Sequence, residues 1–294
     1  MIQRTQKSVL LIAGPTASGK SALALGAART RNGVIINADS MQVYRELSIL
    51  TARPSAEEEA LAPHRLYGTM NGASEYSVAQ WLADAETEIQ TCWINGQLPI
   101  ICGGTGLYFM ALEKGLAKVP PIDPDVREGW RSFEGDLHAE LKARHVPSAE
   151  NLNPADRQRL IRALEVYDSS GKPLSQWQAE AQEHSLLSGV TVERLFMNVE
   201  REELYARADK RFDTMMEQGA LEEVKALPVL DPAMPLMKAI GVPQLRDYLS
   251  GALSLADAVS LSKIATRHYI KRQSTWSRGQ MKEWPVAPSK IGTI

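Results

Sequence analysis

The chain has 294 residues, of which 44% are hydrophobic and 23% are charged, a composition typical of a globular protein with one large or two modest domains. A net charge of −2 excludes a uniformly basic surface, so any contact with a polyanion must come from local clusters. The spacing of the two cysteines, Cys92 and Cys102, fits neither a metal motif nor a disulfide framework. We therefore expect buried, reduced thiols and a cytoplasmic location. The apolar run at 9–13 is too short for a signal peptide or a membrane span.

Four apolar segments predict buried strands: "SVLLIAG" at 8–14, "GVIINAD" at 33–39, "LPIICGG" at 98–104 and "RLFMNV" at 194–199. Continuous apolar strands are typical of a parallel sheet that is covered on both faces. Helical patterns at 21–30 and 77–95 lie between them. This alternation predicts an α/β, doubly wound fold.

About ninety residues separate the third strand from the fourth, which is too long for a simple crossover. Helical patterns at 124–145, 154–169 and 173–184 fill this interval. We predict a core formed by 1–115, a helical insertion at 116–192, and a return to the core at 193–294. That last part is mostly helical and ends in a long helix at 254–278.

A glycine-rich loop follows the first strand and precedes a helix, which is the context that supports a phosphate-binding loop. Its glycines let the backbone wrap around a phosphate, while amides and the helix N-terminus supply positive potential. Lys20 adds a charge, and the Ser21 hydroxyl can bind Mg²⁺. The expected phosphate-binding residues are Gly14, Pro15, Thr16, Ala17, Ser18, Gly19, Lys20 and Ser21.

Two polar residues end the second and third strands. Asp39 would lie at the carboxyl edge of the sheet, where ligands of open α/β sheets bind; its structural alternative is a turn or N-cap. Thr105 follows Gly103 and Gly104, which would allow close approach of a ligand. A simple strand-to-helix turn explains Thr105 equally well.

Basic residues gather in three segments. Residues 260–283 contain six Lys or Arg and one acid, and Lys263, Arg267 and Lys271 recur at helical spacing. This pattern fits either a solvated helix face or contact with a nucleic-acid backbone. Arg207 and Arg211 also share a helix face and suit a diphosphate, unless nearby acids pair with them. The third cluster consists of Arg157, Arg159 and Arg162 in the insertion.

Together these segments resemble one family, the tRNA dimethylallyltransferases, also called tRNA isopentenyltransferases. The family's motifs occur in the family's order and cover most of the chain. They are "GPTASGKS", "INADSMQVYRELSILTARPS", "PHRLYG", "YSVAQW", "ICGGTGLYFMAL", "NPADRQRLIRALEVY", "GKPLS" and "TRHYIKRQSTW". The resemblance implies a P-loop NTPase-like parallel sheet core with a helical insertion domain.

The resemblance also implies a reaction. The dimethylallyl group of dimethylallyl diphosphate would pass to N6 of the adenosine on the 3′ side of the tRNA anticodon, releasing diphosphate. Asp39 matches the family's general base, and Thr105 lies near the target adenine. Lys20, Ser21 with Mg²⁺ and either Arg207 or Arg211 would stabilise the leaving group. The implied tRNA contacts are Asp39, Ser40, Met41, Gln42, Thr105, Arg127, Gln158, Arg159, Leu160, Ile161, Arg162 and Lys271.

Some features depart from the family pattern or leave other functions open. Val242 and Pro243 stand where relatives often have an aromatic and a basic residue, which puts that segment's tRNA contacts in doubt. No cysteine–histidine zinc module is present, which predicts a bacterial-type enzyme, expected to be a monomer without membrane contact. The alternatives are an adenylate dimethylallyltransferase that uses free AMP, ADP or ATP, a P-loop small-molecule kinase, and a non-catalytic RNA-binding protein.

Overall fold

A computed structural model of the chain describes residues 7–147, 149–181 and 185–287. Its five-stranded sheet has the order β3-β2-β4-β1-β5, and every pair of neighbours is parallel. The strands are β1 Ser8–Ala13, β2 Gly33–Asn37, β3 His64–Arg65, β4 Leu98–Gly103 and β5 Thr191–Phe196. The predicted parallel α/β fold is therefore confirmed. The sequence prediction missed β3, because a strand of two residues has no periodicity to detect.

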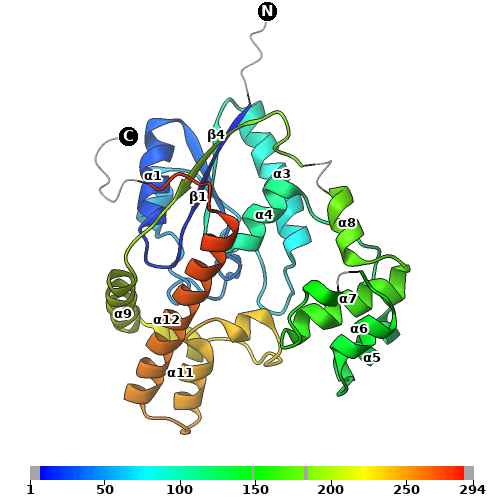
Figure 1. Cartoon of the computed structure of the whole chain (residues 1–294). Helices are drawn as coiled ribbons and strands as arrows, with labels where there is room; N and C mark the ends of the chain where they lie inside the picture. Colours follow the sequence, from blue (N-terminus) through cyan, green and yellow to red (C-terminus); the bar gives the residue numbers. More distant parts are fainter. Residues whose placement is uncertain (1–6, 148, 182–184, 288–294) are drawn as a thin grey trace, which may run out of the picture. The chain divides into compact units, whose positions relative to one another are not determined.

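The sheet is buried between helices α1 Lys20–Thr30 and α3 Val78–Ile94 (Figure 1). Leu10, Ile35 and Ile100 pack with α1 in one core cluster. The opposite face receives α3, which buries Trp81 and Ile89 and starts at a capping box made by Ser77 and Gln80. Burial on both faces explains why the strands are apolar along their whole length.

The register of the sheet brings three loops to one edge. Ala13 of β1 pairs with Gly103 of β4 and Phe196 of β5, and Asn37 of β2 pairs with Cys102 of β4. The strands therefore end side by side. The segments that follow β1, β2 and β4, which hold the glycine loop, Asp39 and Thr105, all start from this carboxyl edge.

A second group of helices packs beside the loop that follows β2. It consists of α9 Arg201–Glu217, α10 Ala220–Lys225, η3 Pro235–Lys238, α11 Val242–Leu249 and α12 Leu255–Gln280. Val43, Tyr44 and Leu47 from the loop share a core with Leu236 and Leu245. Helix α2 Ala56–Leu61 lies between this loop and β3 in the sequence.

Two compact units divide the described residues. One contains those of Met1–Phe109 and Gly189–Ile294, and the other those of Met110–Ser188, with α4 Gly106–Lys114 starting in the first and ending in the second. The second unit is helical: α5 Pro124–Ser132, α6 Leu137–Ala143, η1 Ala149–Asn151, α7 Arg157–Ser170 and α8 Leu174–Ala181. Its core contains Trp130, Leu141, Leu160 and Leu164. The single helical stretch expected at 124–145 is in fact two helices, because the Asp136 side chain caps a new start at Leu137.

Candidate active site

The glycine loop leads into a helix N-terminus that no side chain caps. Ala17 and Gly19 have left-handed φ values of 63° and 91°, which bend the loop between β1 and α1. Gly19 is the N-cap of α1, and no side chain caps the helix. The first amides of α1 therefore have no side-chain acceptor, which is the arrangement that binds a phosphate group.

Lys20 lies over this loop, with its Nζ 3.4 Å from the carbonyl oxygen of Pro15. Burial lowers the pKa of Lys20, while the nearby Cys102 and Asp39 favour its charged form and Arg211 opposes it. The ammonium is thus poorly hydrated and close to a second cation. An anion bound at the loop would relieve both penalties.

The structure distinguishes between the two candidate arginines of α9. Arg211 donates a hydrogen bond from Nη2 to Thr16 Oγ1 at 2.5 Å, and burial lowers its pKa. Arg207 is exposed and forms a 2.5 Å ion pair with Glu203 one turn earlier. Arg211 is therefore the arginine that reaches the glycine loop.

Asp39 is held in place by Asn37, two residues earlier in the chain. The Asp39 amide donates to Asn37 Oδ1 at 2.8 Å, and Asn37 Nδ2 donates to the carbonyl oxygen of Leu66 at 3.1 Å. Trp81 Nε1 donates to the Asn37 carbonyl at 2.7 Å. One oxygen of the Asp39 carboxylate accepts the Met41 amide at 3.0 Å, so Asp39 shapes a turn as well as facing a cavity.

Thr105 connects two of the loops at this edge. Its Oγ1 accepts a hydrogen bond from the Ser40 amide at 3.0 Å, and its own amide donates to the carbonyl oxygen of Ala38 at 3.1 Å. The hydroxyl is therefore bonded to the residue that follows Asp39 and is fixed to the same turn.

The expectation that Gly103 and Gly104 leave room for a ligand is wrong. A Cβ on Gly103 would lie 2.0 Å from the Ala38 carbonyl oxygen, and one on Gly104 would lie 2.3 Å from Gln273 Nε2. The protein itself fills the space beside both glycines. They are needed because Ala38, which follows β2, and Gln273 of α12 lie close to the end of β4.

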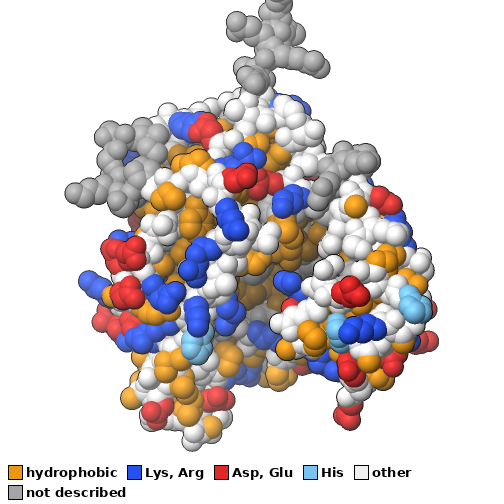
Figure 2. All heavy atoms as spheres, viewed as in Figure 1, with side chains coloured by type: hydrophobic (Ala, Val, Ile, Leu, Met, Phe, Trp, Pro, Cys, Tyr) orange, Lys and Arg blue, Asp and Glu red, His pale blue; other side chains and the backbone are white. Residues whose placement is uncertain are grey.

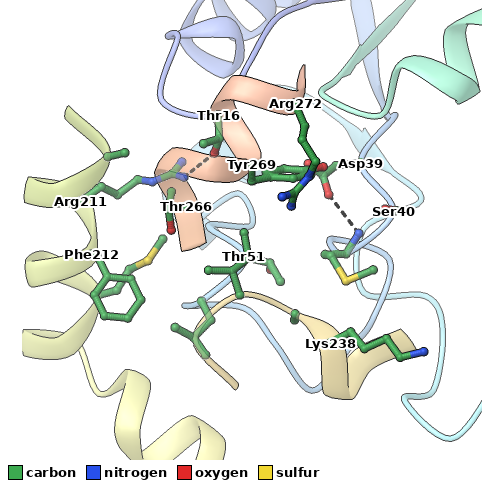
Figure 3. A pocket seen from close by; sticks show the side chains of 16 residues that line it. Thr16, Asp39, Ser40, Thr51, Arg211, Phe212, Lys238, Thr266, Tyr269 and Arg272 are labelled. Atoms are coloured by element: carbon green, nitrogen blue, oxygen red, sulfur yellow. Dashed lines mark hydrogen bonds between the residues drawn. The ribbon is translucent and has the colours of Figure 1, made fainter. Parts of the chain in front are cut away.

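A cavity of about 230 Å³ opens among these groups (Figure 3). Thr16 and Asp39 come from loops at the sheet edge, Arg211 from α9, and Tyr269 from α12. Apolar side chains form much of the remaining wall. They include Met41, Leu50, Ala208, Phe212, Met215 and Ile240. The cavity thus combines a carboxylate, a cation and an apolar chamber, which suits a ligand with a charged end and a hydrocarbon end.

Several lining residues were not predicted as site residues. Tyr269 and Arg272 are one turn apart on α12, and the Arg272 guanidinium lies 5.6 Å from the centre of the Tyr269 ring. The sequence indicated only that these two residues belong to a basic helix and gave no sign that they line a cavity. Lys238 of η3 and Thr51, which lies within the motif "INADSMQVYRELSILTARPS", also line the cavity, although neither was singled out as a site residue.

A second cavity, of about 250 Å³, lies beside the start of α1. Ser21 and Arg211 line it together with Arg53, His64 and Cys102. Gln42 also lines this cavity, and its amide donates to the carbonyl oxygens of Thr51 and Ala52, both at 2.8 Å. Of the predicted tRNA contacts after β2, Ser40 and Met41 therefore face the first cavity, and Gln42 faces the second.

Lys and Arg side chains gather over α12 on the face shown in Figure 2. Lys263 is paired with Asp213 of α9 at 2.6 Å, and Arg267 with Asp209. Lys271 is exposed, two turns after Lys263, and has no ion pair among the described residues. Ion pairs therefore neutralise Lys263 and Arg267, whereas Lys271 offers an uncompensated positive charge at the surface of α12.

The remaining predicted tRNA contacts belong to the helical unit. Arg127 of α5 and Gln158 and Arg159 of α7 are exposed, whereas Ile161 and Arg162 are half-buried. Leu160 is 2% exposed and packs in the core of the unit, so its side chain has no free surface for RNA.

The structure explains why Val242 and Pro243 can stand where relatives often have an aromatic and a basic residue. Val242 is fully buried as the first residue of α11, and Pro243 occupies the first turn of that helix. Proline is favoured in a first turn because its missing N–H would have no partner there. These two residues stabilise the fold locally.

The chemistry of the site fits a Mg²⁺ ion held mainly by substrate. Ser21 is exposed at the first turn of α1, with its hydroxyl beside the uncapped helix end. Within the part of the chain that the structure describes, no three His, Cys, Asp or Glu side chains gather into a metal site. Mg²⁺ commonly takes one or two protein oxygens and fills its coordination with phosphate oxygens and water.

No helix among the described residues has both the length and the apolar composition needed to cross a membrane.

Fold and site together define a P-loop-type α/β protein whose anion-binding loop faces an apolar cavity with a carboxylate. The chain belongs to the IPP transferase family, whose pattern matches residues 42–280. It is 53% identical to the tRNA dimethylallyltransferase of Azorhizobium caulinodans over 282 residues, which are 94% of this chain and 90% of that protein. Identity to the enzyme of the same name from Rhodopseudomonas palustris strain BisA53 is 52%, covering 98% of this chain and 90% of the relative.

Solved structures show the same similarity. A eukaryotic dimethylallyltransferase acting on tRNA superimposes with a TM-score of 0.84 at 27% identity, covering 97% of this chain and 74% of that one. The tRNA isopentenylpyrophosphate transferase of Bacillus halodurans gives a TM-score of 0.69 at 30% identity, with 98% and 92% covered.

Proposed function

We propose that this protein transfers the dimethylallyl group of dimethylallyl diphosphate to N6 of the adenosine on the 3′ side of the anticodon in tRNA. The observation that carries the proposal is a single cavity lined by Asp39, Thr16 and Arg211, in a chain about 50% identical to tRNA dimethylallyltransferases. The carboxylate and the anion-binding groups face the same space. A prenyl transfer needs both, because a proton leaves the acceptor and a diphosphate leaves the donor.

In the proposed reaction the adenine N6 attacks the allylic carbon, the carbon–oxygen bond to diphosphate breaks, and Asp39 takes a proton from N6. An aromatic amine is a weak nucleophile, so removal of this proton as the bond forms lowers the barrier. Asp39 suits this role because its amide donates to Asn37 Oδ1 and one of its carboxylate oxygens accepts the Met41 amide, which fixes its backbone and that oxygen. The other oxygen is then available to the acceptor.

Negative charge grows on the diphosphate as it leaves. The α1 amides, Lys20 and Arg211 would stabilise that charge, and their preorganisation costs nothing during the reaction. Ser21 would supply a hydroxyl ligand to Mg²⁺, which neutralises phosphate charge when bound. Because the Arg207 side chain pairs with Glu203, we assign the diphosphate contact to Arg211.

The acceptor adenine must leave the stack of the anticodon loop to reach Asp39. Ser40, Met41 and Thr105 would contact the extruded nucleotide, since Ser40 and Met41 line the cavity and Thr105 Oγ1 is bonded to Ser40. We further propose that Lys271 binds the RNA backbone. We also propose RNA contacts in the helical unit, because three of its polar or charged side chains are exposed: Arg127, Gln158 and Arg159.

We also propose that a single chain is sufficient and that the reaction takes place in the cytoplasm, where the unmodified tRNA is found. Size-exclusion chromatography with light scattering of the protein alone and with tRNA tests the first point. A dimer as the smallest active species would contradict it.

The function is tested with ¹⁴C-labelled dimethylallyl diphosphate, Mg²⁺ and one of three acceptors: unmodified tRNA, the same tRNA with guanosine at the target position, and AMP. We expect label in the first tRNA alone. Label in AMP but not in tRNA would instead support an adenylate dimethylallyltransferase. ATP hydrolysis with a small-molecule acceptor, and no prenyl transfer, would support a kinase.

A further inference from the structure

Gln273 of α12 is a polar side chain that is 8% exposed and belongs to none of the roles described above. Its Oε1 accepts the backbone amide of Thr16 at 2.9 Å, and its Nε2 donates to the carbonyl oxygen of Gly104 at 3.0 Å. One partner is a donor and the other an acceptor, so the orientation of the Gln273 amide is fixed by its surroundings.

These two bonds join the two halves of the site. Thr16 belongs to the glycine loop, and its side chain is held by Arg211. Gly104 directly precedes Thr105, whose hydroxyl accepts the Ser40 amide next to Asp39. Gln273 therefore connects the segment that would hold the diphosphate to the segment that would hold the acceptor.

The surrounding structure is built to admit this side chain. A Cβ on Gly104 would lie 2.3 Å from Gln273 Nε2, so only glycine at 104 leaves space for the amide. Tyr269, one turn earlier on α12, lies close to Gln273 and lines the cavity. A buried amide with all its groups bonded positions its partners more rigidly than an apolar side chain of the same size.

We propose that Gln273 is a positioning residue, which fixes the distance between the diphosphate loop and the Asp39–Thr105 edge. This inference rests on the proposed function. A prenyl transfer needs the leaving group, the allylic carbon and N6 in line, and misplacement of one group by about 1 Å can cost roughly 10²-fold in rate. Loss of Gln273 is expected to slow transfer while each substrate still binds.

The test compares Gln273→Glu and Gln273→Ala with Gln280→Glu, a control at the exposed end of the same helix. Single-turnover rates are measured with both substrates saturating, and dissociation constants are measured separately for tRNA and for a non-reactive thio analogue of the donor. We expect the Gln273 variants to lose roughly 10- to 100-fold in rate, with dissociation constants within about threefold of wild type. Unchanged rates, or losses that appear only in binding, would overturn the proposal.

The pH dependence of the transfer rate of Gln273→Glu provides a second test of the proposal. A carboxylate can accept from Thr16 but repels the Gly104 carbonyl, whereas a protonated carboxyl can accept and donate as the amide does. The rate relative to wild type should therefore rise as the pH is lowered from about 8 to about 6, since burial favours the neutral form. The Ala variant should show no such recovery, and recovery in both would contradict the assigned bonds.

Amide hydrogen exchange tests the connection independently of activity. Loss of Gln273 should accelerate exchange in the glycine loop and at 39–41 and 104–106 together, with Gln280→Glu unchanged. No acceleration in the Gln273 variants would refute the positioning role. If wild-type protein instead transfers no dimethylallyl group to tRNA, the proposed function fails, and the exchange result still decides whether Gln273 couples the two segments.

Discussion

Arg211 donates a 2.5 Å hydrogen bond to the Thr16 hydroxyl, joining the middle of α9 to the glycine loop across 195 positions of sequence. Burial lowers the pKa of this arginine, so its charge is held in a poorly hydrated place beside Lys20. Two cations next to an uncapped helix end form a site for a doubly charged anion.

Arg211→Gln should weaken the binding of dimethylallyl diphosphate and of inorganic pyrophosphate by roughly 10- to 100-fold. The reason is the loss of charge-assisted hydrogen bonds, each contributing about 1.5–3 kcal/mol. Isothermal titration calorimetry measures both ligands. Arg207→Gln is the matched control on the same helix, because Arg207 is exposed and paired with Glu203. An equal loss in both variants would show that general electrostatics, and not contact, sets the affinity.

Asp39→Asn should lower the rate of prenyl transfer by roughly 10²-fold or more, with tRNA affinity retained. Asparagine still offers an oxygen to the Met41 amide, so the turn should persist while the base is lost. Rapid-quench assays and filter binding measure the two quantities.

Asp231→Asn provides the control for Asp39, because Asp231 is exposed and accepts the Ala233 amide in the same kind of turn. Its rate should equal that of wild type. Full activity of the Asp39 variant would remove Asp39 as the base.

Lys271→Ala should weaken tRNA binding and reduce the slope of log K against log salt concentration by about one charge. Lys263→Ala should change the slope less, since Lys263 is already paired with Asp213 at 2.6 Å. Fluorescence anisotropy over a salt series measures both. Equal slopes for wild type and the Lys271 variant would mean that this end of α12 faces solvent in the complex.

Cys102 lines the second cavity, yet burial raises the pKa of its thiol to about 11. Because the thiolate is the reactive form, alkylation by iodoacetamide near neutral pH should be about 10²-fold slower than in unfolded protein. The rate should rise about tenfold per pH unit until the pH approaches the pKa of the thiol. Mass spectrometry at several pH values measures this, and rapid alkylation of native protein at neutral pH would show that Lys20 stabilises the thiolate.

The sequence was sufficient for the central strands of the sheet and for the order of its chemistry-bearing loops. The apolar segments at 8–14, 33–39 and 98–104 became β1, β2 and β4, because strands buried on both faces must be apolar throughout. Parallel strands end at one edge, so the glycine loop, Asp39 and Thr105 were expected near one another. The two-residue β3 and the break between α5 and α6 escaped prediction, since β3 is defined by its pairing with β2 and the break by the side-chain cap of Asp136.

Contacts between distant segments could be decided only by the tertiary structure. Arg207 and Arg211 are equivalent in the sequence, and the rotation of α9 against the sheet turns only Arg211 toward Thr16. Glycines 103 and 104 looked like room for a ligand, but that room is taken by Ala38 and Gln273. Hydrophobic periodicity determines which elements form. The hydrogen bonds between those elements depend on how residues far apart in the chain pack together. A local sequence pattern contains no information about that packing.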